Sequence, residues 1–85
     1  MIIKYFRTQD NKLPEWFSVI RKTFHKLEIF NVDKGEGLNE ANYYGLKSFP
    51  VLVLENNYGT LLGIWTHDFN EIYEMFFREE GADGD

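Results

Sequence analysis

The sequence predicts an α/β domain in which a mixed four-stranded sheet is flanked by helices, with the element order β-α-β-α-β-β-α. Three observations lead to this prediction. Short apolar runs alternate with helical periodicity in the first half of the chain, which is typical of a βαβ unit with parallel strands. Pro50 then opens a continuously apolar run over residues 51–54, which favours a central strand covered on both faces. Finally, the turn sequence at residues 56–59 predicts an antiparallel hairpin.

The first strand and helix follow from the N-terminal third of the chain. Residues 2–6 form an apolar and aromatic run, which predicts a strand. Pro14 suits the first position of a helix, where its missing N–H costs nothing, and Glu15 would lie near the positive end of the helix dipole. Residues 28–33 complete the unit as a second strand. The helical spacing predicts one wide apolar stripe made of Trp16, Phe17, Ile20, Phe24 and Leu27.

A short second helix and a hairpin come next. Asn39 is a favourable N-cap residue, and Gly45 can adopt the left-handed conformation that ends a helix. We therefore expect a helix between them. The hairpin turn then leads from residues 51–54 into a fourth strand at residues 60–65.

The last helix is expected to begin near Asp68. Asp68 and Glu71 have the spacing of a capping box. The buried stripe of this helix would comprise Phe69, Ile72, Tyr73 and Phe76. We expect a single domain over residues 1–80, followed by a flexible acidic tail over residues 81–85.

The composition excludes several classes of function. The 85 residues include no cysteine, so disulfides, a thiolate nucleophile and sulfur-ligated zinc or iron sites are impossible. The 15 aromatic residues can supply a dense core without a metal or a cross-link, and we expect no cofactor. The N-terminus is too charged for a signal peptide, and no apolar run reaches the ~20 residues that span a bilayer. We therefore expect a soluble, cytoplasmic protein that does not bind membranes.

Charge is distributed unevenly along the chain. Residues 1–50 hold eight Lys and Arg against six Asp and Glu, a net charge of +2, whereas residues 51–85 hold Arg78 against eight acidic residues, a net charge of −7. This balance argues against nucleic acid as a partner, because phosphate backbones require clustered basic residues. It permits a protein partner with a basic surface, although a solvated helix face with an acidic tail explains the same pattern.

Three motifs resemble those of the thioredoxin and glutaredoxin families. The most specific is Ala41-x-x-Tyr44-Gly45-Leu46-x-Ser48-Phe49-Pro50, which is similar to the helix end and cis-proline that precede the third strand in these families. Asp33 resembles the end of their second strand, and residues 63–66 resemble the stretch before their last helix. The resemblance covers residues 2–77 and implies a thioredoxin-like fold with a cis peptide bond at Pro50.

The chain departs from these families at the catalytic motif. Glutaredoxins carry Cys-Pro-Tyr-Cys where this chain has Leu13-Pro14-Glu15-Trp16. Leucine and tryptophan cannot form or resolve a mixed disulfide, so thiol–disulfide exchange is excluded. No other arrangement of side chains indicates an enzyme, and no catalytic residue is assigned. His25 is expected to be an exposed residue of the first helix, and His67 a structural residue near the last helix.

The resemblance implies that binding survives although the thiols are lost. In these families the backbone of the residue before the cis-proline pairs with an extended peptide or with glutathione. The predicted partner groove therefore consists of Leu13, Trp16, Phe49 and Pro50. The two large rings would either anchor a partner or fill the vacated space and seal the groove. Lys12 and residues 66–68 are approximate matches to the groups that hold glutathione.

A second interface is predicted on the acidic last helix. Adjacent residues on a helix cannot both face one core, so one ring of each aromatic pair, at residues 16–17 and 76–77, should be partly exposed or should cover a second packing face. The predicted interface residues are Trp65, Glu71, Glu74, Phe76 and Phe77.

These features lead to the hypothesis of a redox-inactive protein-interaction module. Its small size and lost catalytic motif suit an accessory or virus-encoded protein that binds a host partner. The alternatives are a glutathione-binding protein without its own thiol, and a structural subunit that self-associates through the last helix.

Overall fold

A computed structural model describes residues 1–77 of the protein. The predicted element order is confirmed, and residues 81–85, for which a tail is predicted, lie outside the described part. The elements are β1 (Ile2–Arg7), α1 (Phe17–Ile20), β2 (Lys26–Asn31), α2 (Gly35–Tyr44), β3 (Val51–Glu55), β4 (Leu61–Trp65), α3 (Phe69–Ile72) and a π-helical turn, η1 (Tyr73–Phe77). In residues 1–77, no helix is long and apolar enough to cross a membrane.

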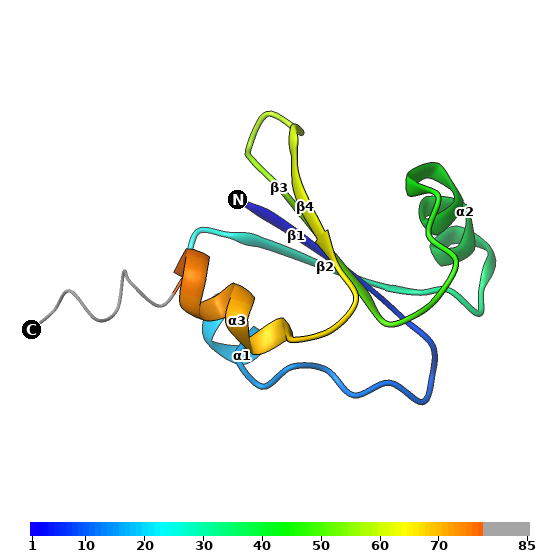
Figure 1. Cartoon of the computed structure of the whole chain (residues 1–85), viewed down its shortest axis with the longest axis horizontal. Helices are drawn as coiled ribbons and strands as arrows, with labels where there is room; N and C mark the ends of the chain where they lie inside the picture. The colour runs from blue at the N-terminus through cyan, green and yellow to red at the C-terminus, as the bar shows by residue number, and fades with distance from the viewer. Residues whose placement is uncertain (78–85) are drawn as a thin grey trace, which may run out of the picture.

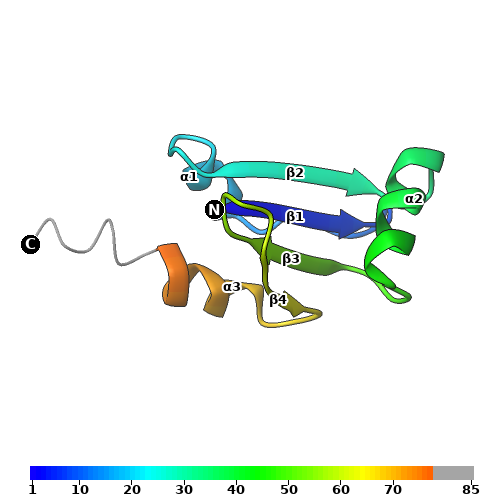
Figure 2. The same cartoon turned by 90° about the horizontal axis from the view of Figure 1, so that it is seen from above.

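The four strands form one mixed sheet in the order β2-β1-β3-β4. β1 pairs with β2 in parallel, whereas the β1–β3 and β3–β4 pairs are antiparallel. Helices α1 and α3 lie together near one end of the sheet, and α2 lies near the other end (Figures 1 and 2). The Phe49–Pro50 peptide bond that leads into β3 is cis.

Two hydrophobic clusters occupy the two faces of the sheet, because successive side chains of a strand point to opposite faces. The cluster beneath α1, α3 and η1 comprises Ile3, Tyr5, Trp16, Phe17, Ile20, Leu52, Leu54, Ile72 and Phe77. The cluster beneath α2 comprises Phe6, Val32, Ala41, Val51 and Val53. Every residue of β3 is buried, which confirms that its apolar run is a central strand.

The first helix is much shorter than predicted. It spans only Phe17–Ile20, Phe24 is fully exposed, and Leu27 belongs to β2, so the predicted five-residue stripe is wrong. The reason is that β2 starts at Lys26 opposite Ile2, which leaves no length for further helical turns. The Thr23 hydroxyl helps to end the helix by donating a hydrogen bond to the Ile20 carbonyl at 2.6 Å.

Trp16 and Phe17 are both buried, so the alternative in which one ring of this pair is partly exposed is wrong. Trp16 is the N-cap of α1 with helical backbone angles, and its ring covers a second packing surface formed by η1. Its ring packs against the rings of Tyr73 and Phe77, at centroid distances of 5.6 and 5.7 Å. Phe17 packs edge-on against Tyr5 at 5.1 Å.

Helix α2 begins earlier than predicted and ends where predicted. Its N-cap is Lys34 rather than Asn39, and no side chain caps it. Gly37 makes the early start possible, because its missing Cβ leaves space for the backbone of Asn31 at the end of β2. Gly45 ends the helix with φ = 74°, which confirms the left-handed stop. The predicted capping box of the last helix is wrong, since Asp68 forms no side-chain cap.

A polar network crosses the sheet beneath α2. The Lys4 ammonium donates to the Tyr44 hydroxyl at 2.8 Å, and this hydroxyl donates to Glu55 Oε2 at 2.7 Å. Lys4 Nζ also lies 3.5 Å from Glu55 Oε1. Glu55 is 7% exposed, so its carboxylate depends on these partners to offset its lost hydration.

This network raises the pKa values of two of its members. Burial raises the pKa of Tyr44, and its hydrogen bond to Glu55 adds to this effect while Lys4 opposes it. Burial lowers the pKa of Lys4, but its hydrogen bond to Tyr44 and the charges of Tyr44 and Glu55 outweigh burial, so the net change is upward. Both groups therefore hold their protons more tightly in the folded state than in the unfolded chain.

The close contact at Gly37 gives a first testable prediction. Gly37→Ala should lower the free energy of unfolding by about 1–3 kcal/mol, because the new methyl group must displace the backbone of Asn31. Gly35→Ala is the matched control, since nothing lies within 4 Å of its Cβ position and its helix is the same. Urea denaturation of both variants measures the difference. Equal stability of the two would contradict the close packing of α2 on β2.

The polar network gives a second prediction. Tyr44→Phe should lower the free energy of unfolding at neutral pH by about 1–3 kcal/mol, because buried Glu55 loses a hydrogen-bond donor. The stability that the raised pKa of Tyr44 contributes is complete below its ordinary value of 10.0 and is lost as pH rises through the folded-state value. Tyr44→Phe should therefore flatten the decline in stability above about pH 10.

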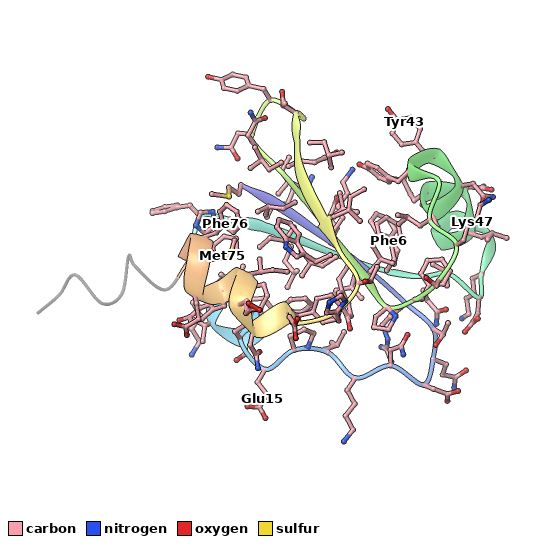
Figure 3. The ribbon with its side chains drawn as sticks, viewed as in Figure 1. Phe6, Glu15, Tyr43, Lys47, Met75 and Phe76 are labelled. Carbon is pink, nitrogen blue, oxygen red and sulfur yellow. The ribbon has the colours of Figure 1, made fainter. Side chains whose placement is uncertain are left out.

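The control for this experiment is Tyr43→Phe. Tyr43 neighbours Tyr44 on α2 but is 81% exposed and projects away from the sheet (Figure 3). Its substitution should leave stability at neutral pH unchanged. Denaturant unfolding across the pH range checks both variants, and a Tyr44→Phe protein as stable as the parent would show that the network is not stabilising.

Candidate functional site

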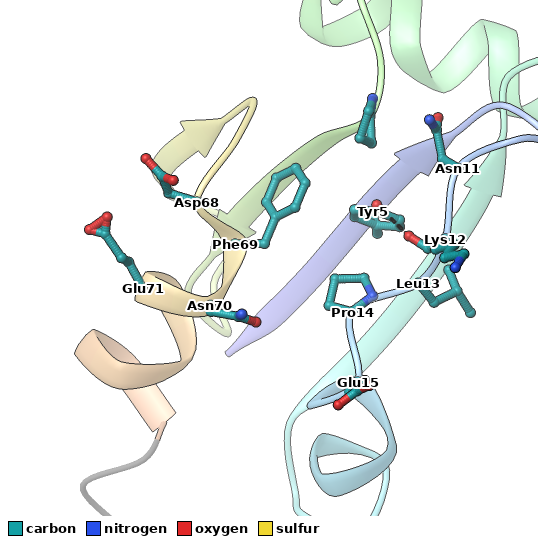
Figure 4. A pocket seen from close by; sticks show the side chains of 11 residues that line it. Tyr5, Asn11, Lys12, Leu13, Pro14, Glu15, Asp68, Phe69, Asn70 and Glu71 are labelled. Atoms are coloured by element: carbon teal, nitrogen blue, oxygen red, sulfur yellow. Dashed lines mark hydrogen bonds between the residues drawn. The ribbon is translucent and has the colours of Figure 1, made fainter.

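A pocket of about 680 Å³ lies between the loop before α1 and the beginning of α3. Three separate segments of the chain and the centre of the sheet contribute to it. Its lining residues are Tyr5, Asn11, Lys12, Leu13, Pro14, Glu15, Pro50, Asp68, Phe69, Asn70 and Glu71. Figure 4 shows the residues of the loop facing those of α3 across the pocket.

The aromatic part of the pocket is formed by Tyr5 and Phe69. Tyr5 projects from β1 and is 1% exposed, and the Phe69 ring meets it edge-on at 5.5 Å. The Tyr5 hydroxyl donates a hydrogen bond to the Lys12 carbonyl at 3.1 Å, which ties the loop to the sheet (Figure 4). Burial raises the pKa of Tyr5, with Arg7 opposing this effect, so the hydroxyl stays protonated as a donor.

The charges of the pocket are mostly negative. The residues that line it include one basic residue, Lys12, and three acidic residues, Glu15, Asp68 and Glu71, whose formal charges sum to −2. All four residues are exposed to solvent. Asp68 Oδ2 lies 3.5 Å from His67 Nε2 on the protein surface. The carboxylates of Glu15 and Glu71 have no ion-pair partner among residues 1–77.

Two of the four predicted groove residues line this pocket. Leu13 is 39% exposed and contributes to one wall, and Pro50 contributes from the start of β3. Trp16 and Phe49 do not line it, so this pocket is not the four-residue groove predicted from the sequence.

The positions of these two rings follow from the tertiary structure. Trp16 turns inward to join the cluster beneath α3 and is 6% exposed. Phe49 packs against the opposite cluster, beneath α2. Phe49 and Pro50 thus lie toward opposite faces of the sheet. Within residues 1–77, the N–H and C=O of Phe49 form no hydrogen bond, so the backbone next to Pro50 is unpaired.

The residues of the second predicted interface differ in their exposure to solvent. Phe77 is 5% exposed and belongs to the core, so it cannot be part of a binding surface. Trp65 and Phe76 are partly buried and meet edge-on at 5.8 Å. Glu74 is exposed, and Glu71 is exposed as a wall of the pocket described above. The five predicted residues do not form one exposed patch.

Several pocket residues were not predicted from the sequence. Tyr5 and Phe69 were assigned to buried positions of a strand and a helix, and Asn11 and Asn70 carried no signal. The sequence could have indicated Phe69 as a pocket residue, because it directly follows Asp68 and the resemblance implies ligand-holding groups at the beginning of the last helix.

The histidines take no part in the pocket. His25 lies before β2 rather than on the first helix, and its Nδ1 lies 3.0 Å from the Met1 amino group. Its ring also meets Phe77 at 4.9 Å, so the expectation of a free surface residue is wrong. Among the described residues, no group of three or more His, Asp or Glu side chains could hold a metal ion.

Comparisons with known proteins establish the fold. No protein-family model matches the chain, and no curated protein sequence matches it. Its structure is similar to that of thioredoxin 1 from the thermophilic eubacterium Thermosipho africanus TCF52B, with a TM-score of 0.74, 13% sequence identity and coverage of 100% of both chains. At this identity the similarity establishes the fold alone. The protein therefore has a thioredoxin-like fold and lacks the Cys-x-x-Cys motif.

Proposed function

We propose that this protein is a redox-inactive interaction module whose pocket receives an extended segment of a protein partner. Without cysteine the chain cannot carry out thiol–disulfide exchange, because that reaction needs an attacking thiolate. The pocket at this end of the sheet is nevertheless open. A binding role for the pocket is therefore compatible with the loss of the thiols.

The unpaired backbone of Phe49 is the observation that carries this proposal. Its N–H and C=O form no hydrogen bond within the described part of the chain, and Pro50 beside it lines the pocket. An extended peptide can satisfy such groups by pairing with them as an added strand. The side chains of the peptide that point inward would then reach Leu13, Pro14 and Phe69. These apolar groups favour the burial of a partner side chain.

Glutathione is a second candidate ligand. Lys12 and Asp68 line the same pocket, so a carboxylate and an ammonium group of one small molecule could find opposite charges there. Glutathione carries a net negative charge at neutral pH, however, and the pocket has a net charge of −2. Repulsion from Glu15 and Glu71 therefore favours a peptide over glutathione.

Self-association is a third candidate role, and β4 is the element that favours it. β4 is an edge strand in which Leu61, Leu62 and Ile64 are 48%, 46% and 42% exposed. The sequence has no charged residue between Asn56 and Thr66, and uncharged apolar edges tend to pair with other strands.

Sedimentation velocity over a range of concentrations should then show a dimer that Leu62→Lys abolishes. A monomer at all concentrations would remove this candidate.

The peptide-binding role is tested by selecting ligands from a displayed library of random peptides on the immobilised protein. We expect enriched peptides whose affinity Leu13→Asn reduces at least about tenfold, because the apolar contact at the pocket wall is lost without a change of charge. Leu38→Asn is the matched control, since Leu38 is 47% exposed on α2, outside the pocket.

Calorimetric titration of the parent and the two variants with a selected peptide measures the effect. Equal weakening by both substitutions would place binding elsewhere and contradict the role of the pocket. Failure to enrich any peptide would contradict peptide binding altogether, and titration with glutathione would then test the second candidate.

A further inference from the structure

The geometry of the pocket points to a cationic partner: an extended peptide that places arginine or lysine side chains against Glu15, Asp68 and Glu71. This inference rests on the function proposed above and specifies the chemistry of the partner. It is separable from that function, because a neutral or acidic peptide could also occupy an open pocket.

Two of the three acidic residues form no ion pair within the described part of the chain. Glu15 and Glu71 have no ion-pair partner within residues 1–77, and Asp68 meets only the exposed ring of His67 at 3.5 Å. Lys12 is the single cation of the lining, and no carboxylate in the described part of the chain pairs with it. A cationic ligand therefore has no internal ion pair to displace from Glu15 or Glu71.

The carboxylates are also placed on both sides of the apolar centre. Asp68 and Glu71 come from the beginning of α3, whereas Glu15 comes from the loop before α1, and Figure 4 shows Phe69 and Pro14 between these two segments. An extended peptide directs alternate side chains to the same face, about 6–7 Å apart. A segment with basic side chains on either side of a small or apolar one would therefore present a cation to each segment.

The net charge of the whole chain also favours a basic partner. Its net charge is −5, so a basic segment is attracted before contact as well as within the pocket. Each exposed ion pair contributes little, about a two- to fivefold change in affinity, so selectivity must come from several carboxylates acting together.

Three blocked peptides of eight residues test the inference. All three are threonine except at positions 3 and 7, which are arginine, glutamine or glutamate and flank the threonine at position 5 on the same face of the extended peptide. Titrations followed by ¹H–¹⁵N NMR should show the arginine peptide binding most tightly and shifting the amide signals of Leu13, Phe69 and Asn70. The glutamine peptide should bind at least about fivefold more weakly, and the glutamate peptide more weakly still. Added salt should weaken only the arginine peptide.

Two neutralising variants locate the effect. Glu15→Gln and Glu71→Gln should each weaken the arginine peptide about two- to fivefold and leave the glutamine peptide unchanged. Glu36→Gln is the control, because Glu36 is an exposed carboxylate on α2, outside the pocket, and its loss changes the net charge equally. It should change the affinity for the arginine peptide much less than Glu71→Gln does, because it acts only through the net charge.

The outcomes separate the two proposals. Equal binding of the three peptides at the pocket would overturn the inference about charge and keep the peptide-binding function. The same would follow if the glutamate peptide bound best, or if Glu36→Gln weakened the arginine peptide as much as Glu71→Gln. If no peptide shifted the pocket signals, the proposed function and the inference would fall together.

Discussion

The antiparallel pairing of β1 with β3 is the constraint on which the rest of the structure depends. These strands form the centre of the sheet, and every residue of β3 is buried. Strands of this kind need apolar cover on both faces, which two clusters and three short helices supply. Because so few residues are available for this cover, aromatic rings such as Trp16 and Phe77, rather than long helices, fill one side.

The same constraint creates the pocket. The cis peptide bond at Pro50 lies directly before β3, and Tyr5 of β1 lies beside it in the pocket wall. The loop before α1 and the beginning of α3 both meet the sheet here, and neither covers the space between them (Figure 4). The site is therefore held by rigid central strands and lined by exposed loop residues. This combination suits binding, because a rigid base orients groups that solvent can reach.

The pocket is open in this cysteine-free chain. Trp16 and Phe49, whose rings could have sealed the pocket, instead contribute to the hydrophobic cluster on each face. The pocket thus remains open, with a net charge of −2 and an unpaired backbone beside Pro50. The protein has a thioredoxin-like fold, and the function proposed above uses this open pocket for recognition, with its charge selecting the partner.

The amino-acid sequence determined the element order, the buried run of β3 and the glycine stop at Gly45, because these depend on local patterns and backbone preferences. Leu13 and Pro50, which the sequence indicated through their position around the fold's motifs, both line the pocket. Tertiary packing alone decided the short α1, the early start of α2, the direction of Trp16 and Phe49, and the meeting of Tyr5 with Phe69. These features depend on where β2 and α3 lie in space, and residues far apart in the chain fix those positions.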